Sequence, residues 1–207
     1  DVMVLTDIGD ATDANTDGGF HLISDFSSKF DALSDGDLLP VGMQIRVAGS
    51  STLMGNPIDV AYDSESDAVY ISVIGNGKVL GFTSIGSGGD LEPSFNKDLT
   101  SASSIYFSSD ETDGNTGNSS TARTTRLYAT STADGNVSVY DGSGVLVKTV
   151  STGSDATEGI FYNAMNDAII QASRSGMALE YYGSFAAVTD LTNIVSDFAG
   201  DADLASP

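Results

Sequence analysis

The chain has 207 residues and contains no cysteine, which excludes a disulfide framework, a thiolate nucleophile and cysteine metal sites. Its 29 acidic and 8 basic residues give a net charge of −21, and such a surface repels nucleic acid and anionic membranes, since both require a cationic footprint. Hydrophobic residues make up 40% of the chain, enough for a sizeable core, yet no apolar run approaches the ~20 residues of a membrane helix.

The first two predicted strands, DVMVLTD (1–7) and GFHLISDF (19–26), flank an insertion rich in Asp, Asn and Gly. The same pair of runs returns three times with a much shorter connection. The later pairs are DAVYISV (67–73) with GKVLGFTS (77–84), RLYATST (126–132) with GNVSVYDG (135–142), and DAIIQAS (167–173) with GMALEYYG (176–183). Alternating apolar residues on either side of a glycine turn predict four β-hairpins.

Three of these hairpins are preceded by another short strand pattern, PIDVAYD (57–63), SSIYFSS (103–109) and TEGIFYN (157–163). Less regular stretches follow the hairpins, at 91–99, 144–150 and 191–198. The repeating unit therefore has four short strands, and we place the units at about 1–56, 57–102, 103–156 and 157–207. Such a unit cannot bury its faces alone, and radial stacking of these units is a β-propeller.

We therefore predict an all-β chain that is a single β-propeller domain over 1–207, with about four repeat units of four-stranded blades. A β-sandwich is the alternative, because its turns are also regularly spaced. A sandwich, however, does not require the same four-strand pattern to return.

The segment IRVAGSSTLMGNPIDVAYDSESDAVYISVIGNGKVLGF (45–82) resembles one unit of the NHL/YVTN-type bacterial β-propeller repeats. In that pattern a short strand ends in a glycine turn and is followed by P-x-x-I/V-A-x-D, D-x-x-Y-V/I and V/I-x-x-F/Y. The matching residues are Pro57, Ala61, Asp63, Asp67, Tyr70 and Phe82. The other units keep only part of it, such as Asp167 and Tyr181. The resemblance implies the propeller fold and an exported location, and it implies no catalytic residues.

The phase of the repeat predicts an incomplete ring. Asp1 aligns with Asp67, at the start of the second strand of a unit, and Pro207 aligns with Pro57, just before a first strand. Three units are then complete and one lacks its first strand. Because open strand edges pair readily, we expect this chain to belong to a larger propeller or to be covered by a partner.

The sequence DANTDG (13–18) matches the first half of the D-x-[DN]-x-[DN]-G calcium loop. Asp13, Asn15 and Asp17 would supply side-chain oxygens, and Gly19 would supply a backbone carbonyl. The carboxylate expected at position twelve is absent, and Asp25 lies one residue beyond that position. These five residues are the predicted metal site and calcium the predicted cofactor, with an ordinary Asp/Asn/Gly turn as the alternative.

The sequence offers no catalytic constellation. His21 is the only histidine, so a Ser-His-Asp triad would have to use it, and no G-x-S-x-G elbow supports one. We predict a secreted, cell-surface or periplasmic module for binding or assembly, with no catalysis of its own. Its partners would be a protein, a glycan or further blades of the same propeller. The alternatives are a hydrolase or lyase with its site on the central face, and a structural subunit of a surface filament or layer.

Overall fold

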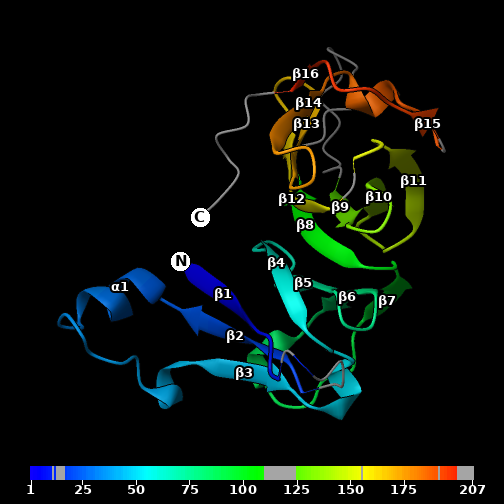
Figure 1. Ribbon diagram of the computed structural model, residues 1–207. Coiled ribbons are helices and arrows are strands. Elements are labelled where there is room, and N and C mark those ends of the chain that lie inside the picture. Colours follow the sequence, from blue (N-terminus) through cyan, green and yellow to red (C-terminus); the bar gives the residue numbers. More distant parts are fainter. Residues whose placement is uncertain (11, 13–16, 110–124, 155, 191, 200–207) are drawn as a thin grey trace.

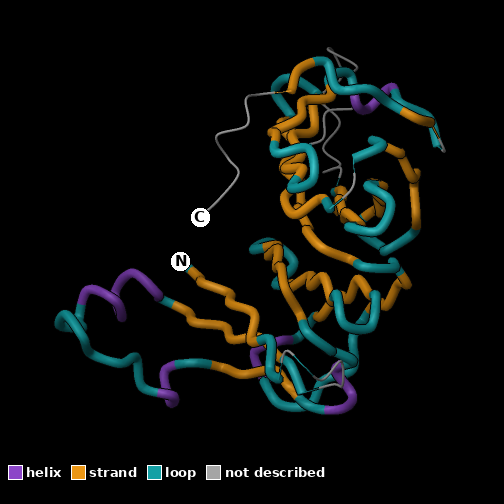
Figure 2. Tube along the Cα trace, in the orientation of Figure 1, coloured by secondary structure: helices purple, strands orange, loops and turns teal. Residues whose placement is uncertain are grey.

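The computed structural model describes residues 1–10, 12, 17–109, 125–154, 156–190 and 192–199. These residues form four small β-sheets, here called sheets A to D, which follow one another around an arc (Figures 1 and 2). The prediction of an all-β chain is confirmed. No helix among these residues is long and apolar enough to span a bilayer.

Each sheet is built mainly from strands that are consecutive in the chain. Sheet A contains β1 (Val2–Asp7), β2 (Gly19–Ser24) and β3 (Ile45–Ala48). Sheet B contains β4 (Pro57–Asp63), β5 (Ala68–Val73), β6 (Lys78–Phe82) and β7 (Phe95–Asp98). Sheet C contains β8 (Ala102–Ser108), β9 (Arg126–Ser131), β10 (Asn136–Asp141), β11 (Leu146–Ser151) and β15 (Thr192–Asn193). Sheet D contains β12 (Thr157–Asn163), β13 (Ala168–Ser173), β14 (Ala178–Tyr182) and β16 (Phe198–Ala199).

The prediction of one fourth strand at 191–198 is wrong, because the structure divides this segment between two sheets. The described part of this segment supplies β15, which pairs in parallel with β11 of sheet C, whereas β16 pairs with β14 of sheet D. The segment thus bridges two sheets instead of closing one. All other strand pairs among the described residues are antiparallel.

A long connection between β2 and β3 was not predicted either. It contains helix α1 (Phe26–Asp31) and the 3₁₀ turn η1 (Val41–Met43), and it projects away from sheet A (Figure 1). The connection is held near β1 by the amide of Ser27, which donates to Oδ2 of Asp1 over 2.9 Å. The shorter connections contain η2 (Ser50–Thr52), η3 (Ile85–Ser87) and η4 (Phe185–Ala187).

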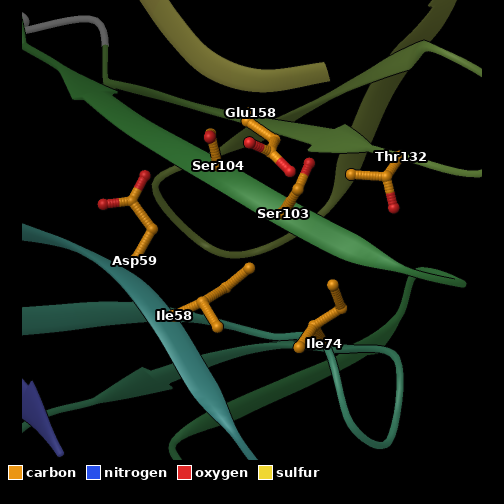
Figure 3. A pocket seen from close by; sticks show the side chains of 7 residues that line it. All are labelled: Ile58, Asp59, Ile74, Ser103, Ser104, Thr132 and Glu158. Carbon is orange, nitrogen blue, oxygen red and sulfur yellow. The ribbon is translucent and has the colours of Figure 1, made fainter. Parts of the chain in front are cut away.

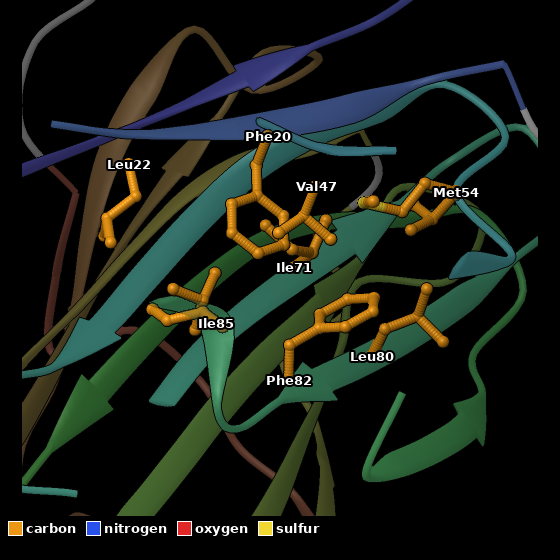
Figure 4. Packing of buried hydrophobic residues seen from close by; sticks show 10 residues of the cluster. Phe20, Leu22, Val47, Met54, Ile71, Leu80, Phe82 and Ile85 are labelled. Carbon is orange, nitrogen blue, oxygen red and sulfur yellow. The ribbon is translucent and has the colours of Figure 1, made fainter. Parts of the chain in front are cut away.

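Apolar side chains fill the space between neighbouring sheets. Between sheets A and B, Phe20 lies 5.4 Å from Phe82, measured between ring centroids, and Ile71 and Leu80 are fully buried beside them (Figure 4). Separate clusters lie between sheets B and C and between sheets C and D. Each sheet therefore obtains its core only from its neighbours, as stacked repeat units do.

The strands β4, β8 and β12 are the inner strands of sheets B, C and D, and each packs against the next along the arc (Figure 1). An aromatic stack repeats beside them. Tyr70 of β5 stacks on Phe107 of β8 at 5.3 Å, and Tyr128 of β9 stacks on Tyr162 of β12 at 4.9 Å. At equivalent positions, a tyrosine of the second strand of one sheet thus stacks on an aromatic side chain of the inner strand of the next sheet.

Sheet A lacks an inner strand among the described residues. Its β1 pairs with β2 as β5 pairs with β6, so β1 corresponds to the second strand of a complete sheet. β1 also packs directly against β4. The edge of β1 that faces away from β2 has no strand partner in the described part of the chain.

A left-handed residue precedes each inner strand. Asn56, Ser101 and Ala156 have φ of 57°, 52° and 53°, a region that side chains other than glycine rarely adopt. The carbonyls of these residues accept hydrogen bonds from the amides of Ile74, Thr132 and Arg174, respectively. The strain of this conformation is therefore offset by a hydrogen bond that ties the start of each inner strand to the following hairpin.

We predict that Ala156→Gly stabilises the protein by roughly 0.5–1 kcal/mol, because glycine removes the steric cost of a left-handed alanine and loses only part of that gain to backbone entropy. Urea denaturation measures the free energy of unfolding. Ala133→Gly is the matched control, since Ala133 is an exposed turn residue outside the left-handed region. Destabilisation by Ala156→Gly equal to that of the control would contradict the prediction.

Candidate functional site

The structure does not bring the five predicted calcium ligands together. Gly19 begins β2 and Asp25 follows its last residue, so at ~3.3 Å per residue they lie roughly 20 Å apart. Calcium ligands lie about 2.3–2.6 Å from the ion, so these two residues cannot share one ion. Gly19 and Asp25 are therefore not ligands of the same ion.

The remaining predicted ligands lie in or beside the first insertion. Asp17 accepts a hydrogen bond at Oδ2 from the amide of Asp10, at 2.7 Å, and so fixes the turn that follows β1. Asp13 and Asn15 lie outside the described residues. Among the described residues, no three His, Cys, Asp or Glu side chains gather where they could hold a metal ion. Calcium binding at 13–19 stays a prediction.

A pocket of about 320 Å³ lies at the starting ends of the three inner strands. Each of these strands has a register irregularity near its first residue, and a bulge of this kind re-aims side chains. The pocket is lined by Ile58, Asp59, Ile74, Ser103, Ser104, Thr132 and Glu158 (Figure 3). Sheets B, C and D all contribute, so the pocket exists only because the sheets are stacked.

Side-chain hydroxyls beside the pocket hydrogen-bond one sheet to the next. Ser72 Oγ of sheet B donates to the carbonyl of Ser103 in sheet C, at 2.6 Å. Ser103 Oγ donates in turn to the carbonyl of Thr157 in sheet D, at 2.7 Å. All three residues are buried. A buried hydroxyl that already donates to a carbonyl is a structural group, because leaving that carbonyl unpaired would be costly.

Asp59 is the most distinctive ionisable group of the pocket. Its Oδ1 accepts from the amide of Val60 at 2.8 Å, and its Oδ2 accepts from the amide of Ile105, on the neighbouring inner strand, at 2.9 Å. Burial raises the pKa of the Asp59 carboxyl above its usual value, while the two amides act in the opposite direction. No Lys or Arg of the described chain forms an ion pair with it.

Glu158 is a different kind of carboxyl. It lies at the rim, where the Arg174 guanidinium is 2.6 Å away, and the two side chains are 47% and 74% exposed. An exposed pair of this kind contributes little to stability, because solvent screens it. Glu158 therefore already has a counter-charge, whereas Asp59 has none in the part of the chain that the structure describes.

The other features noted in the sequence do not add a catalytic group. His21 Nε2 lies 3.8 Å from Oδ2 of Asp7, and that same oxygen is 2.8 Å from Arg46. His21 is thus part of a charged cluster on sheet A, and no serine of the described chain hydrogen-bonds to it. A second hollow, of about 230 Å³, lies at the other end of the inner strands β4 and β8.

Sequence reasoning did not find the pocket. Its residues come from three different units, and no short motif contains them. The signal is weak, because Ile58, Ser103 and Glu158 are each the second residue of β4, β8 and β12, whereas the predicted run at 103–109 begins one residue too late. Comparing that position across the units would have marked it as a shared location on the inner strands.

Comparison with known proteins identifies the fold alone. No family model matches the chain, and no curated protein matches it. Among solved structures, a chain of a nidogen–laminin complex aligns with a TM-score of 0.51 and 12% identity, over 87% of this chain and 56% of that one. A candidate 6-phosphogluconolactonase from Bacteroides fragilis NCTC 9343 aligns with a TM-score of 0.53 and 14% identity, over 86% and 49%.

A protein of unknown function from Desulfotomaculum acetoxidans DSM 771 gives a TM-score of 0.52 and 12% identity, over 83% of this chain and 52% of that one. The chain thus spans about half the length of the structures it matches. Since the first two are β-propellers, the predicted fold class is confirmed, and the described sheets form part of a β-propeller.

We predict that Asp59→Asn changes how stability depends on pH. Between the ordinary aspartate pKa of ~3.9 and the raised folded value, the folded protein binds more protons than the unfolded chain, so this carboxyl lowers stability as the pH rises. Asparagine does not ionise, so the variant does not lose stability in this way as the pH rises. Its free energy of unfolding, relative to wild type, should therefore increase from about pH 4 upward and then level off.

Asp98→Asn is the control for this titration. A hydrogen bond from Lys78 lowers the pKa of Asp98, so the stability of this variant relative to wild type should change in the opposite direction, and only slightly because Asp98 is exposed. Urea denaturation at a series of pH values measures both differences. A pH-independent difference for Asp59→Asn would refute the prediction.

Proposed function

We propose that the chain is a secreted or cell-surface β-propeller module for binding or assembly, with no catalysis of its own. The observation that carries the proposal is the open edge of β1. In sheets B, C and D the corresponding strands β5, β9 and β13 are each flanked on both sides, and the flanking inner strands are β4, β8 and β12. The equivalent place beside β1 has no strand among the described residues.

Exposed apolar side chains on β1 support the proposal that a neighbouring strand is missing. Leu5 is 45% exposed and Val2 is 39% exposed, whereas the equivalent residues of β5, Ile71 and Ala68, are 0% and 3% exposed. A strand edge with exposed apolar side chains is a template for pairing with another strand. We infer that the occupant is an inner strand of the same propeller ring, with the pattern of β4, β8 and β12.

The length comparison favours the same occupant, because the chain spans about half of the propeller structures that it matches. We further propose that the repeat is of the NHL/YVTN type, on the residues of 45–82 quoted above. The extracellular or periplasmic location rests on the Gly-, Ser-, Thr-, Asp- and Asn-rich composition. A strand from a different protein is the competing source of the missing inner strand.

The main competing function is a hydrolase or lyase with its site on the central face. The described pocket gives it limited support. The Ser103 hydroxyl already donates to a neighbouring carbonyl, and Glu158 is paired with Arg174. Turnover of a glycoside or ester panel by the wild type, lost in Asp59→Asn, would favour the enzyme over the binding module. The third function, a filament or layer subunit, would require ordered polymers at native concentration.

A synthetic inner strand tests the proposal. A peptide of residues 56–64, NPIDVAYDS, should bind the 207-residue chain and slow hydrogen exchange at the β1 amides that point away from β2. The control peptide carries Val60→Pro and Tyr62→Pro, because proline cannot donate to a strand ladder. Equal effects of the two peptides, or no protection of β1, would overturn the assembly proposal.

A further inference from the structure

The geometry points to a second binding function that does not involve the β1 edge. We propose that the pocket at the starting ends of β4, β8 and β12 binds a primary alkylammonium group, such as the end of a lysine side chain or of a polyamine. Asp59 is the anchor in this site. The proposal goes beyond the assembly function above, since it concerns a different surface.

Asp59 provides a fixed negative charge. The amides of Val60 and Ile105 hold one carboxylate oxygen each, so the group is oriented before any ligand arrives. Each oxygen of a carboxylate can accept more than one hydrogen bond, and an ionised carboxylate accepts only. A partly buried carboxylate with no cationic partner is costly, and a ligand ammonium removes that cost by donating up to three hydrogen bonds.

Ser104 provides a second polar contact. It is only 4% exposed and lines the pocket between sheets B and D (Figure 3). Its amide and carbonyl both hydrogen-bond to Thr130 Oγ1, but its own hydroxyl has no partner among the described residues. Because Ser104 lines the pocket, its hydroxyl is available to accept a hydrogen bond from the ammonium.

An apolar wall completes the site. Ile58 and Ile74 line the pocket opposite the polar side chains of β8 and β12 (Figure 3), and each is 37% exposed. The methylenes of an alkylammonium stem would cover these side chains, as the stem of a lysine does on apolar surface. The volume of about 320 Å³ lies at the small end of the range of ligand pockets, about 300–1,000 Å³.

Other ligand classes fit less well. An anion would meet Asp59 and Glu158 on a molecule of net charge −21. A neutral sugar would leave the Asp59 charge uncompensated. A calcium ion requires six to eight oxygens, and this pocket contributes only two carboxyl groups from the described chain.

Amide NMR titrations with 1,5-diaminopentane, Nα-acetyl-lysine methylamide and neutral 1,5-pentanediol test the proposal at 0.15 M salt, which screens diffuse attraction to the acidic surface. The two amines should shift the Ser104 and Ile105 amides and the diol should not. The diamine tests a polyamine source and the lysine derivative tests a protein source. Binding of either supports the site.

Three variants make the titration specific. Asp59→Asn should weaken binding by roughly tenfold or more, because it removes the charged acceptor. Ile74→Lys should block binding while leaving Asp59 intact, since it places an ammonium in the pocket permanently. Glu92→Gln removes the same charge from an exposed position and should change affinity by less than about twofold.

Three results would overturn the site. The first is equal binding of the diol and the diamine. The second is amide shifts spread over the acidic surface that are unchanged by Asp59→Asn and Ile74→Lys. The third is calcium shifting the same amides when neither amine does. Because the peptide experiment monitors β1, loss of the ammonium site leaves the assembly proposal standing, and failure of the peptide leaves this site standing.

Discussion

Contact between successive inner strands is the constraint on which the rest of this structure depends. A four-stranded sheet of this size cannot bury both faces, so each sheet is stable only against its neighbours. Hydrogen bonds make that contact directional, because Ser72 of β5 and the inner-strand residues Ser103 and Asp59 bond to backbone groups of the next sheet, over 2.6, 2.7 and 2.9 Å. Aromatic stacks and apolar clusters fill the space beside them.

The pocket is a consequence of the same contact. The bulges lie at the starts of the inner strands, where Asp59 and Ser103 hydrogen-bond to backbone groups of the neighbouring sheet. The Asp59 carboxylate is fixed by two backbone amides, and its charge remains without a cation in the described chain. The same carboxylate therefore links sheets B and C and serves as the anchor of the proposed ammonium site. The pocket cannot form in an isolated sheet, because three sheets line it.

The sequence predicted the hairpins and inner strands well because alternation of apolar residues and glycine turns are local signals. It failed where tertiary contacts decide. The connection around α1 has no buried side chain in the helix, and 191–198 divides between two sheets. The calcium motif placed Gly19 and Asp25 in one site because spacing alone does not show that a straight strand separates them. The pocket was missed because its residues come from three units.

The pH dependence of the Ile105 amide signal in two-dimensional NMR tests the contact between inner strands most directly. If the Asp59 carboxylate joins sheets B and C through this amide, the Ile105 signal should titrate with a midpoint above the usual aspartate pKa of ~3.9. The titration should disappear in Asp59→Asn. An Ile105 amide that does not titrate in the wild type, or that titrates identically in the variant, would contradict the inner-strand contact.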